Sequence, residues 1–196
     1  MSWSVGEAGA LALKAARGAG MTWGQAEEAG FAVRWLQQRN VPGIAALSVY
    51  LAQYDPHKMD KFSCPINVGS AISDMALTPP SNLGRVHTPV LLLPFIAAIA
   101  IDTSVRLRIG GVTIDVFNHD FESGTAISNI QRIKGECHLE LGDSNNFIAN
   151  GQCAMRIPDT AKDAMAVLEQ FAQRTYAPST EESRLSGAGA DADVND

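Results

Sequence analysis

The sequence predicts an α+β protein with a cluster of three helices at its N-terminus packed on an antiparallel sheet, one C-terminal helix and an extended tail. Apolar residues recur at helical spacing through residues 1–55 and again in 159–176, and they alternate with polar residues in parts of 56–158. At 196 residues, the chain has the usual length of one domain. We therefore expect these regions, and a tail over 177–196, to belong to one domain.

The second predicted helix has the most regular pattern in the chain, and we expect the other elements to be arranged around it. Thr22 and Gln25 form a capping box, which places the start of this helix at Trp23. Its buried side is formed by residues spaced three or four apart, namely Ala26, Ala29, Val33 and Leu36. Ser4 and Glu7 form the same kind of capping box and start the first helix.

Small residues predict close contact between the first two helices. The first helix is rich in alanine and glycine, and Gly18 and Gly20 end it. A third helix is expected from about Pro42 to Tyr54. The C-terminal helix should start with Asp159 or Thr160 as its cap and end near Tyr176. Its inward side chains should be Ala161, Met165, Leu168 and Phe171.

Alternation of apolar and polar residues predicts the sheet. Two strands, 105–109 and 112–116, flank Gly110–Gly111, which is typical of a two-residue hairpin turn. Further strands are expected at 127–133, 137–141 and 152–157. Alternating strands of this kind form an antiparallel sheet with one face towards water.

Two segments are harder to assign from the sequence, and the loop between them is clearer. Residues 66–76 fit a short strand or a short helix, and 90–100 is apolar throughout, which suits a buried strand or helix. Pro94 argues against a central strand in the second of these. The prolines within 78–82 predict a loop.

Composition indicates a soluble cytoplasmic protein. Hydrophobic residues make up 46% and charged residues 18% of the chain, so a real core is possible. The net charge of −6, with no basic stripe, argues against nucleic acid as a partner. The longest apolar run, 89–101, is too short to cross a bilayer, and we see no signal peptide. Three widely spaced cysteines favour a reducing compartment.

Glu28 is the first candidate catalytic residue. At 100° per residue it falls between Phe31, Ala32 and Trp35, on an apolar flank of the second helix. A carboxylate in such surroundings is costly unless it is paired or protonated. It could therefore be a tuned acid or base, or could hold a cationic ligand. The alternatives are an ion pair with an arginine such as Arg17, or a flank of the helix that is exposed to solvent.

Cys64 is the second candidate catalytic residue. It precedes Pro65 after a polar loop in which His57, Lys58 or Lys61 could favour the thiolate, as a nucleophile requires. The alternative, which we favour, is a small buried side chain.

Trp23, His119 and Arg184 are candidates for ligand binding. His119 follows a predicted strand and could be a metal ligand or general base, although Asn118 and Asp120 favour simple turn chemistry. The histidines show no zinc-ligand spacing, so no metal site is predicted. Arg184 could clamp a carboxylate, or be solvated in the tail.

Three separated groups of residues resemble a known family. The groups are Lys14–Gly20 with Trp23–Gly24 and Ala26–Gly30; Cys64–Pro65 with Gly69 and Asp74; and Tyr176–Pro178 with Ser183–Arg184 and Gly187–Gly189. Together they resemble an uncharacterised, mainly proteobacterial family known as a domain of unknown function. The resemblance spans the chain, although Ala192–Val194 departs from the small-residue run expected near the end. It implies no established activity or cofactor.

Two functions are consistent with these observations. The protein could be an enzyme or an enzyme subunit acting on a small polar metabolite, at a pocket between helices and sheet formed by Glu28, Cys64 and Arg184. Alternatively, it could be a non-catalytic assembly protein that docks through its Gly/Ala-rich helical face and tail, as a homodimer or with a partner subunit. The sequence leaves the cofactor and the substrate open.

Overall fold

The computed structural model describes residues 3–122, 135–143, 147–151 and 153–176. It confirms the α+β class, with helices at the N-terminus and an antiparallel sheet. The predicted strand at 127–133 and the predicted tail at 177–196 lie outside these residues.

The elements follow one another in a simple order. The helices are α1 (Val5–Gly18), α2 (Trp23–Gln38), α3 (Gly43–Gln53), α4 (Pro65–Ser73), α5 (Leu93–Ile99) and α6 (Lys162–Gln173). The short 3-10 helices are η1 (Pro89–Leu92) and η3 (Asp159–Ala161). The strands are β1 (Ser81–Arg85), β2 (Val105–Ile109), β3 (Val112–Phe117), β4 (Asp120–Phe121) and β5 (Glu136–Leu141).

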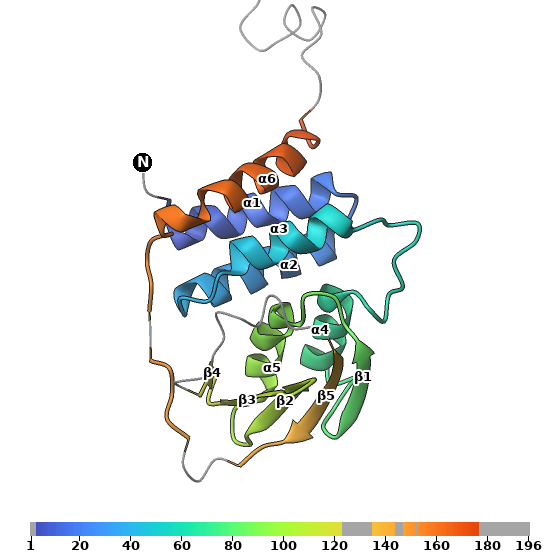
Figure 1. Cartoon of the computed structure of the whole chain (residues 1–196), viewed down its shortest axis with the longest axis vertical. Coiled ribbons are helices and arrows are strands. Elements are labelled where there is room, and N and C mark those ends of the chain that lie inside the picture. The colour runs from blue at the N-terminus through green and yellow to red at the C-terminus, as the bar shows by residue number, and fades with distance from the viewer. Residues whose placement is uncertain (1–2, 123–134, 144–146, 152, 177–196) are drawn as a thin grey trace, which may run out of the picture.

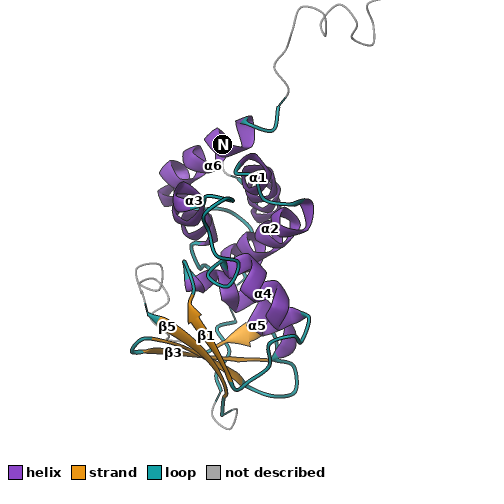
Figure 2. Ribbon diagram, turned by 90° about the vertical axis from the view of Figure 1, so that its right-hand side faces the viewer, coloured by secondary structure: helices purple, strands orange, loops and turns teal. Residues whose placement is uncertain are grey.

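The fold has three levels along its long axis. Helices α1, α2, α3 and α6 form a bundle at one end, and the sheet lies at the other (Figure 1). Figure 2 shows α4 and α5 between the bundle and the sheet. The predicted helical cluster therefore gains α6 as a fourth member, and α4 and α5 cover the sheet from the bundle's side.

Both predicted capping boxes are present. Ser4 and Glu7 exchange side-chain and backbone hydrogen bonds at the start of α1, and Thr22 and Gln25 do the same at the start of α2. The residues predicted to form the inner side of α2 are all fully buried. These starts depend on contacts within four residues, which explains why the sequence predicted them.

Glycines bring neighbouring helices into close contact, as predicted. A Cβ atom at Gly30 of α2 would lie 2.9 Å from the carbonyl oxygen of Gly9 in α1. A Cβ atom at Gly18 would lie only 1.8 Å from the carbonyl oxygen of Phe171 in α6. Gly20 ends the α1 region with φ of +96°, a conformation that favours glycine.

The remaining helices differ from the predictions at their ends and on the buried side of α6, where Met165 and Leu168 are buried as predicted but Ala161 and Phe171 only in part. Helix α3 starts at Gly43 and ends at Gln53, with Pro42 at the cap position. Neither Asp159 nor Thr160 caps α6 through its side chain, because both belong to a 3-10 turn that leads into the helix.

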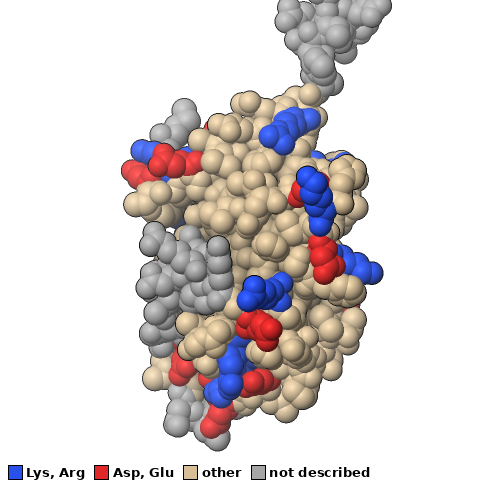
Figure 3. Space-filling view, turned by 45° about the vertical axis from the view of Figure 1, so that its right-hand side comes forward, with Lys and Arg blue, Asp and Glu red and all other residues tan. Residues whose placement is uncertain are grey.

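The sheet is antiparallel with the order β1-β5-β2-β3-β4 among the described residues. The predicted hairpin joins β2 and β3 through Gly110–Gly111. On the polar face, Arg106 forms two hydrogen bonds to Asp115, at 2.7 and 2.8 Å. Arg108 pairs with Glu140 on β5. Figure 3 shows positive and negative side chains close together over the lower part of the molecule, with no large patch of one sign on that face.

Several uncertain segments are now assigned, and two predictions are wrong. Residues 66–76 fall largely in α4, and 90–100 holds η1 and α5 with Pro94 in the first turn of α5. The loop expected over 78–82 ends early, because β1 begins at Ser81 and pairs with β5. The strand expected at 152–157 is wrong for 153–157, where only an isolated bridge links Arg156 to Ser4.

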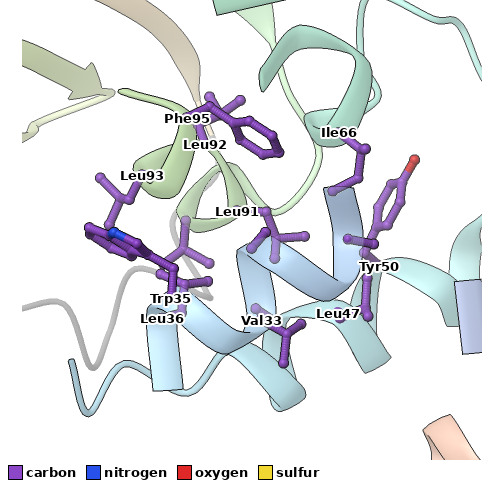
Figure 4. Packing of buried hydrophobic residues seen from close by; sticks show 14 of the residues in the cluster. Val33, Trp35, Leu36, Leu47, Tyr50, Ile66, Leu91, Leu92, Leu93 and Phe95 are labelled. Carbon is purple, nitrogen blue, oxygen red and sulfur yellow. The ribbon is translucent and has the colours of Figure 1, made fainter. Parts of the chain in front are cut away.

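The core continues from the bundle into the middle level. In Figure 4, Leu91 of η1 points between side chains of α2 and α3, and Trp35 lies close to Leu93. The Phe95 ring leaves no room beside Gly69 of α4, where a Cβ atom would come within 2.2 Å of it. The same ring meets Phe31 of α2 edge-on, with 5.9 Å between ring centres. These contacts fix α4 and α5 against α2.

Candidate functional site

Glu28 lies on the side of α2 that faces α4, and its side chain is half-buried. Burial raises the pKa of its carboxyl group, and the nearby carboxylates of Asp74 and Glu27 raise it further. Glu28 has no hydrogen bond or ion pair with any residue that the structure describes. Of the interpretations considered from the sequence, the ion pair is not formed among the described residues, and the tuned acid and the solvent-exposed flank both stay predictions.

Arg17 does not pair with Glu28. Its guanidinium lies 4.7 Å from the ring centre of Trp23 and donates a hydrogen bond to the carbonyl oxygen of Met21. Arg17 thereby links the end of α1 to the start of α2. The ion pair considered from the sequence is not formed in the structure.

The aromatic residues near Glu28 in the helical pattern have partners in other elements. Phe31 packs on Phe95 of α5, and Trp35 packs on Phe121 of β4 with 6.3 Å between ring centres. The side-chain contact between α2 and α4 on this side is polar: Gln25 Nε2 donates a hydrogen bond to Asn67 Oδ1 at 2.7 Å. Glu28 follows Gln25 by one helical turn, so it lies beside the polar seam between these helices.

Cys64 is buried at the N-terminal end of α4, at the cap position before Pro65. The hydroxyl group of Tyr50 in α3 donates a hydrogen bond to its sulfur at 3.0 Å. Burial and the neighbouring sulfur raise the pKa of Tyr50, so this hydroxyl stays protonated and remains a donor. The placement favours the interpretation of Cys64 as a packed side chain.

The groups proposed to activate Cys64 lie at the surface. His57 is exposed, and its backbone N–H donates to Asp55. The ammonium group of Lys58 pairs with the same carboxylate at 3.1 Å. Lys61 lies over the ring of Phe62 at 5.0 Å. The structure thus brings none of these groups to the Cys64 sulfur.

Glu28 of α2 and Cys64 at the start of α4 have different neighbours. Asp74, whose charge acts on Glu28, is at the C-terminal end of α4, and Cys64 is at its N-terminal end. Cys64 and Asp74 are ten positions apart, which corresponds to about 15 Å at 1.5 Å per helical residue. A nucleophile and its acid or base must lie within hydrogen-bond distance, and among the described residues the Cys64 sulfur is bonded to Tyr50 and not to Glu28, so the two candidates do not form one catalytic pair.

The remaining candidates are placed separately. Trp23 is 64% exposed at the start of α2. His119 and Asn118 both have positive φ in the tight turn between β3 and β4, as turn chemistry requires, and His119 Nδ1 lies 3.0 Å from the carbonyl oxygen of Ala97. Arg184 lies outside the described residues.

A cluster around Arg39 was not predicted. Its guanidinium stacks 3.9 Å from the Trp35 ring centre, pairs with Asp120 at 3.1 Å and donates to the carbonyl oxygen of His119. Asp120 also accepts a hydrogen bond from the backbone of Gly151. Arg39 and Asp120 are 81 residues apart in the sequence, and no local pattern connects them. The cluster joins the bundle to the sheet.

Two adjoining pockets beside α6 were also not predicted; the larger lies between α1 and α6, and the smaller lies between Trp3 and the start of α6. Their volumes are about 380 and 170 Å³, and Trp3 and Glu169 contribute to both. Glu28 lines neither of them. One signal in the sequence is consistent with the larger pocket: Ala10 and Lys14, which line it, lie one helical turn apart on the outer side of α1.

Within the described part of the chain, no group of three His, Cys, Asp or Glu side chains is arranged to hold a metal ion. None of the described helices has both the length and the apolar character needed to cross a bilayer.

The fold and these residues define an α+β protein with a half-buried acid between two helices. Residues 3–85 match the model of the family described as protein of unknown function, DUF3726. The match includes α1 to α4 and β1, and with them two of the three segments that carried the resemblance. It confirms the similarity to a family of unknown function. No curated protein and no solved structure matches the chain.

Proposed function

We propose that the protein is a cytoplasmic enzyme, or a subunit of one, that acts on a small polar metabolite through the Glu28 carboxyl group. The observation that supports this is a half-buried carboxyl with a raised pKa and without a partner among the described residues. General acids and bases work best when their pKa approaches the working pH, and burial beside other carboxylates has that effect. Glu28 would give or accept a proton at the seam between α2 and α4.

The other candidates take supporting roles in this proposal. Cys64 would hold the start of α4 through its contact with Tyr50, and would not attack the substrate. Trp23 and His119 would be surfaces for ligand contact, and Arg184 would bind an anionic group of the substrate.

The test uses the full-length protein with a panel of small polar metabolites, first for binding by ligand-detected NMR and then for turnover. Glu28→Gln should lower turnover of a bound metabolite by about 10²-fold or more, the usual contribution of a general acid or base. Glu136→Gln makes the same change at an exposed position on β5, which does not act on the Glu28 carboxyl, and serves as the matched control. Full turnover by Glu28→Gln would refute the role of Glu28.

A non-catalytic role in assembly is the second candidate, and the exposure of Trp23 favours it. Exposed tryptophans are enriched among the residues that dominate protein interfaces. The Gly/Ala-rich face considered for docking is used within the chain, because Gly9 and Gly30 face each other. Sedimentation velocity of the full-length protein and of Trp23→Ala, alone and with co-purified proteins, tests this role. Equal sedimentation coefficients of the two proteins under both conditions would argue against it.

A further inference from the structure

The larger pocket beside α6 lies along two helices that run in the same direction. The segments that precede α1 and α6 are joined, because the backbone N–H of Ile157 donates to the carbonyl oxygen of Trp3 at 2.9 Å. The last turns of the two helices also meet, where Gly18 contacts Phe171. The pocket between them has a volume of about 380 Å³, which falls within the range of small-molecule sites.

The end of this pocket near the start of α1 is acidic. Glu169 of α6 lies at this end, because it and Trp3 also line the adjoining smaller pocket. Glu7 contributes from the first turn of α1. Hydrogen bonds from Ser4 and, to a smaller extent, the charge of Arg156 lower the pKa of Glu7, so its carboxylate is already engaged at the helix cap. The side chain of Glu169 has no ion pair or hydrogen bond with any described residue, and its carboxylate is available to a ligand.

The opposite end of the pocket is basic. Lys14 lines it from the later part of α1, and its ammonium group lies 6.0 Å from the ring centre of Tyr176, which follows α6. This ammonium group pairs with no carboxylate in the described ranges. Gln173, the last residue of α6, adds a side-chain amide that can donate hydrogen bonds. Between the two ends, the floor of the pocket is apolar, with Leu11 and Ala172 buried in it.

This arrangement selects a ligand by the charge at each of its ends. Lys162 and Asp159 of the smaller pocket pair with each other at 3.2 Å and leave the charges of the larger pocket unchanged. A dianion would be repelled by Glu169 and Glu7, and a dication by Lys14. An α-amino acid carries both charges at one carbon and cannot reach both ends, since Glu7 and Lys14 are about 10 Å apart along α1 at 1.5 Å per residue. A zwitterion with its charges at opposite ends of an apolar chain satisfies both.

We propose that the larger pocket binds an aliphatic ω-amino acid, a molecule with an ammonium group and a carboxylate group at the two ends of a methylene chain. Its ammonium group pairs with Glu169 and lies against the ring of Trp3, its carboxylate pairs with Lys14, and its methylene groups cover the apolar floor. Glu28 lines neither pocket, so this inference does not depend on the role proposed for Glu28.

Titration of the isotope-labelled, full-length protein with ε-aminocaproate, followed by NMR, tests the proposal. The expected Kd is about 1 mM, because the ligand is small and exposed ion pairs contribute little. The backbone amide signals of α1 and α6 should shift, and those of the sheet should not. Norleucine is an isomer with both charges at one carbon, and caproate and hexylamine each lack one charge. All three should bind at least about tenfold more weakly than ε-aminocaproate.

Charge variants test the two ends of the pocket separately. Glu169→Gln should weaken the binding of ε-aminocaproate about fivefold, the effect of losing one exposed ion pair. Lys14→Glu should abolish it and should instead allow hexamethylenediamine to bind with a Kd of about 1 mM, because both ends are then acidic. Lys58→Glu makes the same charge change on an exposed lysine outside the pocket and should alter neither affinity. Unaltered melting temperatures identify variants that remain folded.

Three results would overturn the proposal. The first is an affinity for ε-aminocaproate no greater than that for norleucine. The second is a folded Lys14→Glu variant that binds ε-aminocaproate as the wild type does, or that gains no affinity for hexamethylenediamine. The third is a set of shifted amide signals that lies outside α1 and α6, which would place the ligand elsewhere on the protein.

Discussion

At the scale of single residues, the carboxyl group of Glu28 is held where its protonated form is favoured. Burial comes first among the causes, followed by the charges of Asp74 and Glu27. A carboxyl whose pKa is higher in the folded state than in the unfolded state binds more protons when folded. Stability is therefore lost as pH rises from the ordinary value of 4.5 through the folded pKa.

We predict that Glu28→Gln is more stable than the wild type above this range and equal to it at lower pH. The gain should stay below about 1 kcal/mol, because a half-exposed group is screened by water. Urea unfolding at several pH values measures the difference. A gain that persists unchanged below pH 4.5 would show that it does not come from ionisation.

The Tyr50–Cys64 hydrogen bond allows a second prediction at this scale. Cys64→Ala should destabilise the fold by about 1–3 kcal/mol, because the buried Tyr50 hydroxyl loses its acceptor. Tyr50→Phe in the same background should recover part of that loss. Chemical denaturation of the single and double variants gives the coupling free energy between Cys64 and Tyr50. If the two losses of unfolding free energy simply add, the contact contributes nothing to stability.

At the scale of elements, glycines set the spacing of the helices. Gly18 has no room for a Cβ atom because the backbone of α6 lies against it at Phe171. By contrast, nothing lies within 4 Å of a Cβ atom built at Gly24, in the first turn of α2. The two positions form a matched pair, since both glycines are helical and only one carries a contact.

We predict that Gly18→Ala destabilises the protein by about 1–3 kcal/mol, the usual cost of added bulk in a packed site. Gly24→Ala should instead stabilise it by up to about 1 kcal/mol, because alanine has the higher helix propensity. Thermal unfolding of both variants checks this. Equal effects would show that α6 shifts freely away from α1.

At the scale of the whole molecule, Arg39 connects the bundle to the sheet. It stacks on Trp35 and pairs with Asp120, and both groups are largely buried. A lysine keeps the charge but loses the planar stack and the second donor.

We predict that Arg39→Lys costs about 1–3 kcal/mol, as expected when a charge-assisted contact is weakened. Hydrogen exchange should increase most in the backbone of the turn between β3 and β4, where Arg39 contacts His119 and Asp120. The turn between β2 and β3, at Gly110–Gly111, serves as the internal control. Equal acceleration in both turns would argue against a local connection.

The sequence by itself determined the local features of this protein. The capping boxes at Ser4 and Thr22 and the hairpin at Gly110–Gly111 involve residues within a few positions of each other, so their hydrogen bonds can be read directly from the order of residues. The α+β class and the close contact of α1 with α2 followed from periodicity and small residues. The sequence also identified Glu28 as a candidate catalytic residue, from its position on the second helix.

Only the tertiary structure decided what surrounds these residues. The pKa of Glu28 depends on Asp74, Cys64 is covered by Tyr50, and Arg39 meets Asp120 across 81 positions of sequence. The larger pocket forms because α1 and α6, which are far apart in the sequence, pack together. Burial and electrostatic environment come from residues that folding brings together, and periodicity along one segment holds no information about which residues those are.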